Sequence, residues 1–174
     1  QYLSLVHESD EAVKNLINYF SNVDDPVEII FFGDHQPSLN SNFYPILNGK
    51  GLTGLTEDEL EKLYTVPFFI WTNYDTQEET VDITSLDYLS TMALERAGIE
   101  LPAYNKFLAD MQEVVPAINS RGYYSKSKGC YLHIDEAEGK EKEWIEKYHM
   151  LQYNSMFDKK NRSSFFFPYN LKSK

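Results

Sequence analysis

Apolar residues recur at helical spacing in four stretches of the chain, and each stretch predicts an amphipathic helix. The predicted helices cover residues 9–20, 86–97, 104–114 and the region around 144–151. Ser9 or Asp10 is expected to cap the first helix, and Thr84 or Ser85 the second. Gly98 directly follows the second helix, where glycine is the usual C-terminal cap.

Two apolar runs predict strands, at Ile29–Phe32 and at Val66–Trp71, and the short, bounded first run is expected to be fully buried. A shorter strand is expected over residues 130–134. Because strands alternate with helices, the predicted fold class is α/β, a partial sheet with flanking helices. Two clear strands are few for a sheet with helices on both faces, so we expect the chain to be part of a larger domain.

A polar segment rich in Asn, Ser, Gly and Pro separates the two apolar runs, over residues 36–55. A loop of this length inside a compact domain is often functional. Thr56 follows it, and its capping-box spacing to Glu59 predicts a short helix through Leu63. Residues 119–129 are also expected to be mostly loop.

Composition and charge exclude several classes of protein. The chain has 174 residues, the size of one domain, and its 42% hydrophobic content argues against disorder. A net charge of −11 argues against a nucleic-acid surface. The single cysteine, Cys130, excludes an internal disulfide. No apolar run approaches the roughly eighteen residues of a membrane span. The chain starts at Gln1, so we expect a piece of a longer polypeptide.

The strongest chemical signal is the pair Asp34 and His35, which follows the first apolar run and Gly33. A carboxylate and an imidazole are both metal ligands, and ligands of α/β sheets bind beyond the carboxyl ends of strands. Gly33 permits a turn that would let both side chains reach one ion. A Gly-Asp turn with a surface histidine explains the same residues equally well. Two ligands are also only half of a coordination shell.

The other candidate residues give weaker signals. His7 is expected to cap or pack, and His149 to lie on a helix surface. His133 and Asp135 have the spacing of ligands on one strand face, which is a common coincidence. Residues 71–73 end the second strand, where a tryptophan packing on the sheet is a simpler interpretation than a pocket edge. No serine, threonine or cysteine has the sequence context of a nucleophile.

The stretch Phe31–Leu39, Phe-Phe-Gly-Asp-His-Gln-Pro-Ser-Leu, resembles the sulfatase domain of lipoteichoic acid synthase-like proteins in the alkaline phosphatase superfamily. The resemblance covers nearly the whole chain. Residues 2–5 together with 9–12, 66–71 and 83–99 are similar to neighbouring segments of that domain in the same order. Residues 156–162 are similar to the closing segment of Firmicutes members.

By this resemblance, Asp34 and His35 are two ligands of a divalent ion, Mn²⁺ or Mg²⁺, or Ca²⁺ in a true sulfatase. The family's acidic ligand, threonine nucleophile and substrate-binding histidine lie on the amino-terminal side and have no counterpart here. The chain would then hold no catalytic nucleophile, and its substrate-binding residues are unknown. Residues 1–174 would form the C-terminal portion of one sulfatase-like domain, with 1–115 as the metal-strand core and 116–174 as a C-terminal extension.

The resemblance implies a parent enzyme that is anchored on the extracytoplasmic face of the cell membrane by upstream segments. It would act on sulfate or phosphate esters, such as a lipid phosphoglycerol used for lipoteichoic acid-like polymers, and not on nucleic acid. The 36–55 loop differs from the better-known synthases and leaves the substrate open. This chain alone is expected to be inactive. The alternatives are a hydrolase of small sulfuric or phosphoric esters and a non-catalytic module that binds cell-wall polymer.

Overall fold

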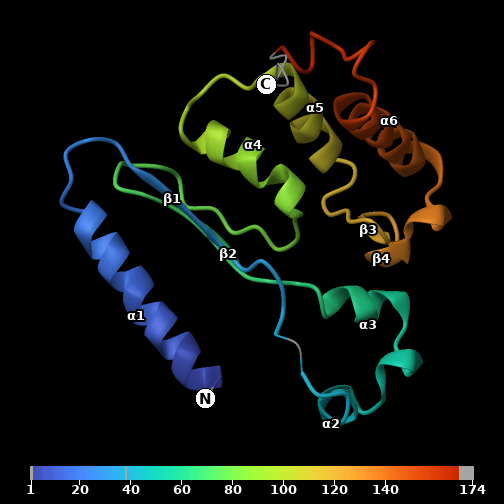
Figure 1. Cartoon of the computed structure of the whole chain (residues 1–174), viewed down its shortest axis with the longest axis horizontal. Coiled ribbons are helices and arrows are strands. Elements are labelled where there is room, and N and C mark those ends of the chain that lie inside the picture. Colours follow the sequence, from blue (N-terminus) through green and yellow to red (C-terminus); the bar gives the residue numbers. More distant parts are fainter. Residues whose placement is uncertain (1, 38, 169–174) are drawn as a thin grey trace. The chain divides into compact units, whose positions relative to one another are not determined.

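The computed structural model describes residues 2–37 and 39–168, so Ser38 of the Phe31–Leu39 stretch lies outside the described residues. The elements in chain order are α1 (Tyr2–Phe20), β1 (Glu28–Phe32), α2 (Phe43–Asn48), η1 (Leu52–Gly54), α3 (Glu57–Lys62), β2 (Phe68–Thr72), α4 (Leu86–Arg96), α5 (Ala103–Gln112), β3 (Gly122–Ser125), β4 (Cys130–His133), η2 (Ile134–Glu136) and α6 (Gly139–Met156) (Figure 1). This mixture of small sheets and flanking helices confirms the α/β class. The chain divides into two units: residues up to 33 with 67–79, and residues 34–66 with those from 80 onward.

Unit 1 consists of α1 and an antiparallel pair of strands, β1 and β2. Ile30 lies opposite Ile70, and Phe31 opposite Phe69, with the two phenyl rings stacked at 5.2 Å between centroids. Beyond the last strand pair, the Gly33 N–H donates to the carbonyl of Pro67 at 3.1 Å. The strand pairing thus continues to the residue before Asp34.

Asn73, one residue past β2, holds the connection between α1 and β1. Its side-chain amide lies 3.2, 2.9 and 2.9 Å from the carbonyl oxygens of Phe20, Val23 and Asp25. Its side-chain oxygen accepts the Val27 N–H at 2.8 Å. One side chain therefore satisfies the backbone groups of a turn that has no regular structure of its own.

Both predicted apolar surfaces of unit 1 are only partly covered, so the prediction of a fully buried first strand is wrong. Phe31 and Phe32 are 40% and 45% exposed. No residue of α1 is buried, although Val13, Ile17 and Phe20 share one face of that helix and are half-buried. An apolar run predicts a strand but does not say whether a second layer is present to cover it.

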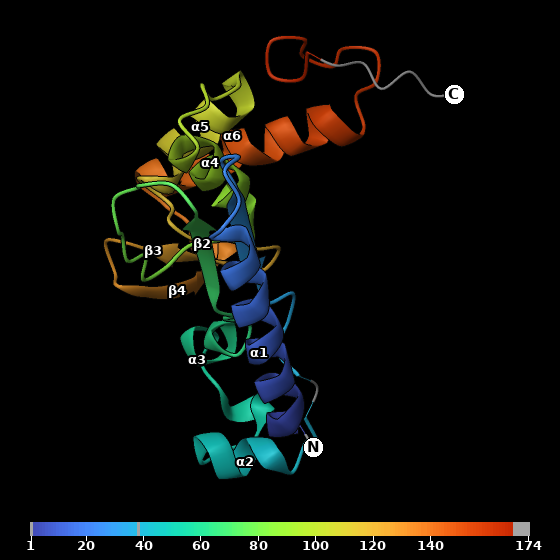
Figure 2. The ribbon, with the colours of Figure 1, turned by 90° about the vertical axis from the view of Figure 1, so that its left-hand side faces the viewer.

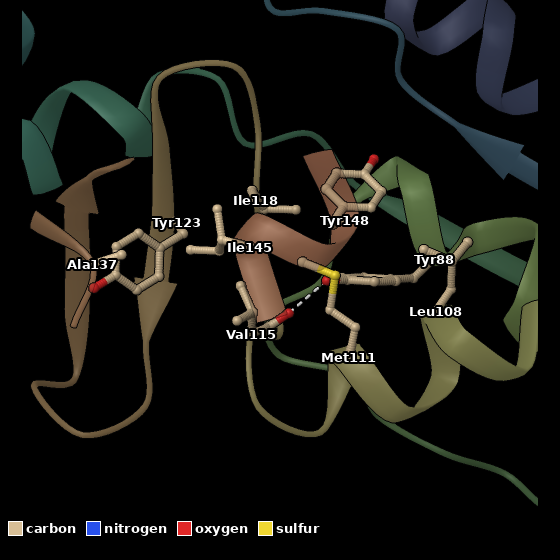
Figure 3. Packing of buried hydrophobic residues seen from close by; sticks show 9 residues of the cluster. All are labelled: Tyr88, Leu108, Met111, Val115, Ile118, Tyr123, Ala137, Ile145 and Tyr148. Atoms are coloured by element: carbon tan, nitrogen blue, oxygen red, sulfur yellow. Dashed lines mark hydrogen bonds between the residues drawn. The ribbon is translucent and has the colours of Figure 1, made fainter. Parts of the chain in front are cut away.

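Unit 2 carries the hydrophobic core of the chain (Figure 3). Tyr88 from α4 lies against Leu108 and Met111 from α5, and Ile145 comes from α6; all of these are at most 4% exposed. The buried Tyr88 hydroxyl donates to the Val115 carbonyl at 2.7 Å. This core joins residues on both sides of position 115. The expected division into 1–115 and 116–174 stays a prediction.

Polar contacts fix α3 to the hairpin of β3 and β4 within unit 2. The Tyr131 N–H donates to an Asp58 carboxylate oxygen at 3.0 Å. The buried Glu61 accepts a hydrogen bond from the Asn119 side chain. Arg121 pairs with Glu57 at 2.8 Å. Hydrogen bonds from Lys62 and then from the Tyr131 N–H lower the pKa of Asp58.

The helix ends test the predicted caps. Thr56 and Glu59 form the predicted capping box of α3. Gly98 adopts the left-handed conformation expected of a C-terminal cap, with φ 67°. Ser9 does not cap α1, because the helix already begins at Tyr2 and the Ser9 hydroxyl donates to a carbonyl four residues back. Ser85 is the N-cap residue of α4, but its hydroxyl bonds to the backbone of Ile118.

Two predicted loops contain regular structure. The 36–55 segment includes the six-residue helix α2 and the short 3₁₀ helix η1. The 119–129 segment includes β3, which pairs with β4 in antiparallel register. The strand predicted at 130–134 is confirmed as β4, and the helix around 144–151 is confirmed as α6.

Candidate functional site

Asp34 and His35 lie directly beyond β1, as the sequence predicted, and both are exposed. The His35 side chain is 76% exposed and the Asp34 side chain 83%. His35 Nε2 lies 3.5 Å from an Asp34 carboxylate oxygen. The other carboxylate oxygen of Asp34 accepts the His35 backbone N–H at 2.9 Å. The pair therefore presents one carboxylate oxygen and one ring nitrogen side by side to solvent.

The contact at the second ring nitrogen fixes the tautomer of His35. Nδ1 lies 2.9 Å from the backbone carbonyl of Gln36, which can only accept a hydrogen bond. Nδ1 must therefore carry a proton, and in the neutral ring Nε2 keeps its lone pair. This is the arrangement that orients a metal-binding histidine in known metal sites.

Gln36 also holds the segment in place, a role that sequence reasoning missed. Its side-chain amide donates to the carbonyl of Thr65, twenty-nine positions along the chain. Thr65 lies three residues before β2 begins. No local pattern marks such a contact, because it depends on which segments the fold brings together. The hydrogen bond restrains the segment that carries Asp34 and His35.

The donor atoms fit half of a divalent-metal site. Two ligands at about 2.1 Å from one ion lie roughly 3.0 to 3.4 Å apart, depending on geometry. The observed separation of 3.5 Å between His35 Nε2 and the Asp34 oxygen is close to this range. Within residues 2–37 and 39–168, no three histidine, cysteine, aspartate or glutamate side chains are grouped to hold an ion. The described residues therefore offer two candidate ligands at this position and no third.

The remaining histidines have other surroundings. His7 lies within α1 and is exposed, so it caps neither end of the helix. His149 is exposed on α6, as predicted. His133 lies 3.4 Å from an Asp135 carboxylate oxygen, but the same ring nitrogen accepts the Asp135 backbone N–H at 3.3 Å. His133 thus caps η2, and its own backbone N–H donates to a Glu136 carboxylate oxygen.

A buried cluster around Glu141 also escaped sequence reasoning. The Ser125 hydroxyl lies 2.9 and 3.1 Å from the two Glu141 carboxylate oxygens, and the Tyr123 hydroxyl donates to the same group at 3.2 Å. Burial, and then the Glu141 charge, raises the pKa of Tyr123 to about 12. Ser125 is fully buried, so it cannot reach a substrate as a nucleophile. The cluster joins β3 to the first turn of α6.

Comparison with known proteins identifies relatives of this arrangement. Residues 1–99, which include both strands of unit 1 and the Asp34–His35 pair, match the family model "Sulfatase". The chain is 26% identical over 169 residues to a putative cyclic beta-1,2-glucan modification protein of Rhizobium meliloti (strain 1021), covering 95% of this chain and 26% of the relative. It is 45% identical over 40 residues to the capsular polysaccharide biosynthesis protein RkpI of the same organism, covering 23% of this chain and 7% of that protein. No solved structure matches the chain.

The length and the source organism of these relatives bear on two expectations from the sequence. The chain spans about a quarter of the length of the glucan modification protein. Both relatives come from a proteobacterium, so they give no support to the resemblance of residues 156–162 to Firmicutes members. Across the helices that the structure describes, none has the length and apolar character needed to cross a membrane.

Proposed function

The chain belongs to the sulfatase family, and from this premise we propose that it is part of a metal-dependent enzyme acting on sulfate or phosphate esters. Asp34 and His35 are assigned as two ligands of its divalent ion. The observation that carries this proposal is the exposed ligand pair directly beyond β1, within the segment that matches the family. The other ligands and the nucleophile are assigned to polypeptide outside these 174 residues.

The partly covered surfaces of unit 1 support an incomplete domain. Along α1, the exposed apolar side chains include Leu5, Val6 and Leu16, at 61%, 47% and 44% exposure. The β1 side chains Phe31 and Phe32 are also exposed. Burial of such apolar surface yields roughly 25 cal/mol per Å², so a stable domain would cover it. We assign this covering role to the remainder of the sulfatase domain.

The residues present have defined tasks in the proposed reaction. Asp34 supplies a charged oxygen and His35 a neutral ring nitrogen, and the Gln36 carbonyl holds the imidazole in the tautomer that binds metal. A divalent ion at this position supplies charge stabilisation to the oxygens of the transferred group and activates a hydroxyl nucleophile. The nucleophile would be the threonine of the family, located outside this chain. Because imidazole binds metal only when neutral, metal binding weakens in acid.

The names of the relatives narrow the substrate class. One is named for the modification of a cyclic beta-1,2-glucan and the other for the biosynthesis of a capsular polysaccharide. We propose that the parent enzyme transfers or removes a phosphoglycerol, phosphate or sulfate group on a cell-envelope glycan, with lipid phosphoglycerol as one donor. The proposed metal is Mn²⁺ or Mg²⁺. The proposed location is the extracytoplasmic face of the membrane, where envelope glycans are modified.

The test compares the intact parent protein with the 174-residue chain. Both are assayed for release or transfer of the head group of a lipid phosphoglycerol, and for hydrolysis of an aryl sulfate. The parent is expected to turn over one of these substrates, and the chain alone neither. In the parent, Asp34→Asn should abolish turnover, whereas Asp24→Asn, the same charge change at an exposed residue of the α1–β1 connection, should not. A fully active Asp34→Asn parent, or an active isolated chain, would overturn the assignment.

A further inference from the structure

The helix α6 carries apolar side chains that face the core and others, near its C-terminal end, that are exposed. One side packs into the core through Ile145 and Tyr148, each 4% exposed. Nearer its C-terminal end the helix exposes Met150, Tyr153 and Met156 by 63%, 62% and 66%, and Phe157, which follows it, is 66% exposed. Contiguous exposed apolar side chains of this size often mark a contact surface. Among the residues that the structure describes, nothing covers these exposed apolar side chains.

Two lysines extend the same surface. Lys159 and Lys160 are exposed in the turn that follows Phe157. Figure 2 shows the backbone of this segment beyond α6. The turn is held in shape: an Asp158 carboxylate oxygen accepts the Asn161 N–H at 3.1 Å. We define the terminal patch as Met150, Tyr153, Met156, Phe157, Lys159 and Lys160.

The side chain of Asn154 ties this turn to α6. Its amide nitrogen donates to the Asn161 carbonyl at 3.0 Å, and its oxygen accepts the Ser163 N–H at 2.8 Å. The Tyr153 and Phe157 rings lie 5.6 Å apart between centroids. The lysines and the aromatic rings are thus presented by one fixed piece of structure.

The charge of this region is opposite to that of the rest of the chain. Residues 156–174 contain five basic residues and one acidic residue, a net charge of +4. The whole chain carries −11, so residues 1–155 carry −15. The overall acidity had given no sign of a basic surface. Such an asymmetry favours an anionic partner for this end of the chain.

We propose that the terminal patch docks on an anionic lipid bilayer. Tyrosine and phenylalanine side chains sit at the level of the headgroups, where the lysines meet the negative lipid charge. A second copy of the chain fits less well, because it would bring four lysines together between two chains of net charge −11. The inference adds a membrane contact within this chain to the upstream anchor expected for the parent. It does not depend on the metal assignment.

The experiment is co-sedimentation of the 174-residue chain with vesicles of phosphatidylcholine alone and of phosphatidylcholine with phosphatidylglycerol. The chain is expected to sediment with the anionic vesicles and to be released by salt. Replacing both patch lysines by glutamine should lower the partition coefficient roughly 25-fold, at about fivefold for each lysine. The double change Tyr153→Ser and Phe157→Ser should abolish sedimentation, with an unchanged circular dichroism spectrum. The matched control is Lys140→Gln with Lys142→Gln in the first turn of α6, which should bind like the wild type.

Each remaining outcome contradicts the proposal. Equal binding to neutral and anionic vesicles would remove the role of charge. Equal losses in the patch and control lysine variants would indicate a nonspecific effect of net charge. Concentration-dependent dimerisation that Tyr153→Ser and Phe157→Ser abolish, without vesicle binding, would assign the patch to a second copy of the chain.

Discussion

Replacing Asn73 by alanine is expected to release the connection between α1 and β1. The side-chain amide nitrogen has two hydrogens for the three carbonyl oxygens within 3.2 Å, and its oxygen accepts the Val27 N–H. The loss is therefore about three hydrogen bonds. At about 1 kcal/mol net for each, the local opening of this turn becomes about 3 kcal/mol easier.

Hydrogen exchange at the Val27 amide measures that opening. A change of about 3 kcal/mol corresponds to roughly 100-fold faster exchange in the Asn73→Ala variant. Asn73→Asp keeps an acceptor for the Val27 N–H but has no hydrogen for the three carbonyl oxygens, so its exchange should also be faster than in the wild type. The control is Asn22→Ala, which removes one exposed bond to the Asn18 carbonyl and should leave Val27 exchange within about twofold. Equal exchange in the Asn73 and Asn22 variants would refute the reasoning.

Three further predictions follow from packing, charge and hydrogen bonding. Ile145→Ala should lower the free energy of unfolding, measured by urea denaturation, by about 2–4 kcal/mol. Met150→Ala, at an exposed position of the same helix, should change it by no more than about 0.5 kcal/mol. Similar losses in the two variants would contradict the assigned core. Hydrogen bonds from the Lys50 side chain and then from the Thr56 backbone N–H lower the pKa of Glu59 from 4.5 to about 2. The stabilisation from these bonds is therefore complete above pH 4.5 and is lost as the pH falls toward 2. An NMR titration midpoint of Glu59 near 4.5 would contradict this. The ring of His35 should show the Nδ1-protonated tautomer in ¹⁵N NMR at neutral or higher pH, and an Nε2-protonated ring would show that its contact with the next carbonyl is not formed.

The local features of the fold were predictable because their causes lie within a few residues. The capping box of α3 depends on the Thr56 hydroxyl and the Glu59 carboxylate, three positions apart, and the structure confirms it. Gly98 takes a left-handed conformation that most residues avoid, so its place after α4 was also evident. The same holds for α6, whose apolar spacing marks the side that faces the core.

Features that depend on distant partners were missed. The strand β3 contains Tyr123 and Tyr124, and it is a strand because it pairs with β4. The exposure of β1 follows from which layers cover it, which no run of apolar residues records. Asp34 and His35 were found because two ligand types stand together, but the hydrogen bond from Gln36 to Thr65 has no counterpart in the local pattern.

Metal titration of the intact parent protein tests the central claim most directly, because Asp34 and His35 are proposed as first-sphere ligands. The wild type is expected to bind one Mn²⁺ or Mg²⁺ at the proposed site. Asp34→Asn and His35→Gln should each weaken binding by at least about 100-fold, since removal of a ligand should cost no less than the 10–100-fold loss seen for outer-sphere partners. His149→Gln, at an exposed position of α6, should leave the affinity unchanged. An unchanged affinity and stoichiometry in both the Asp34 and His35 variants would contradict the assignment.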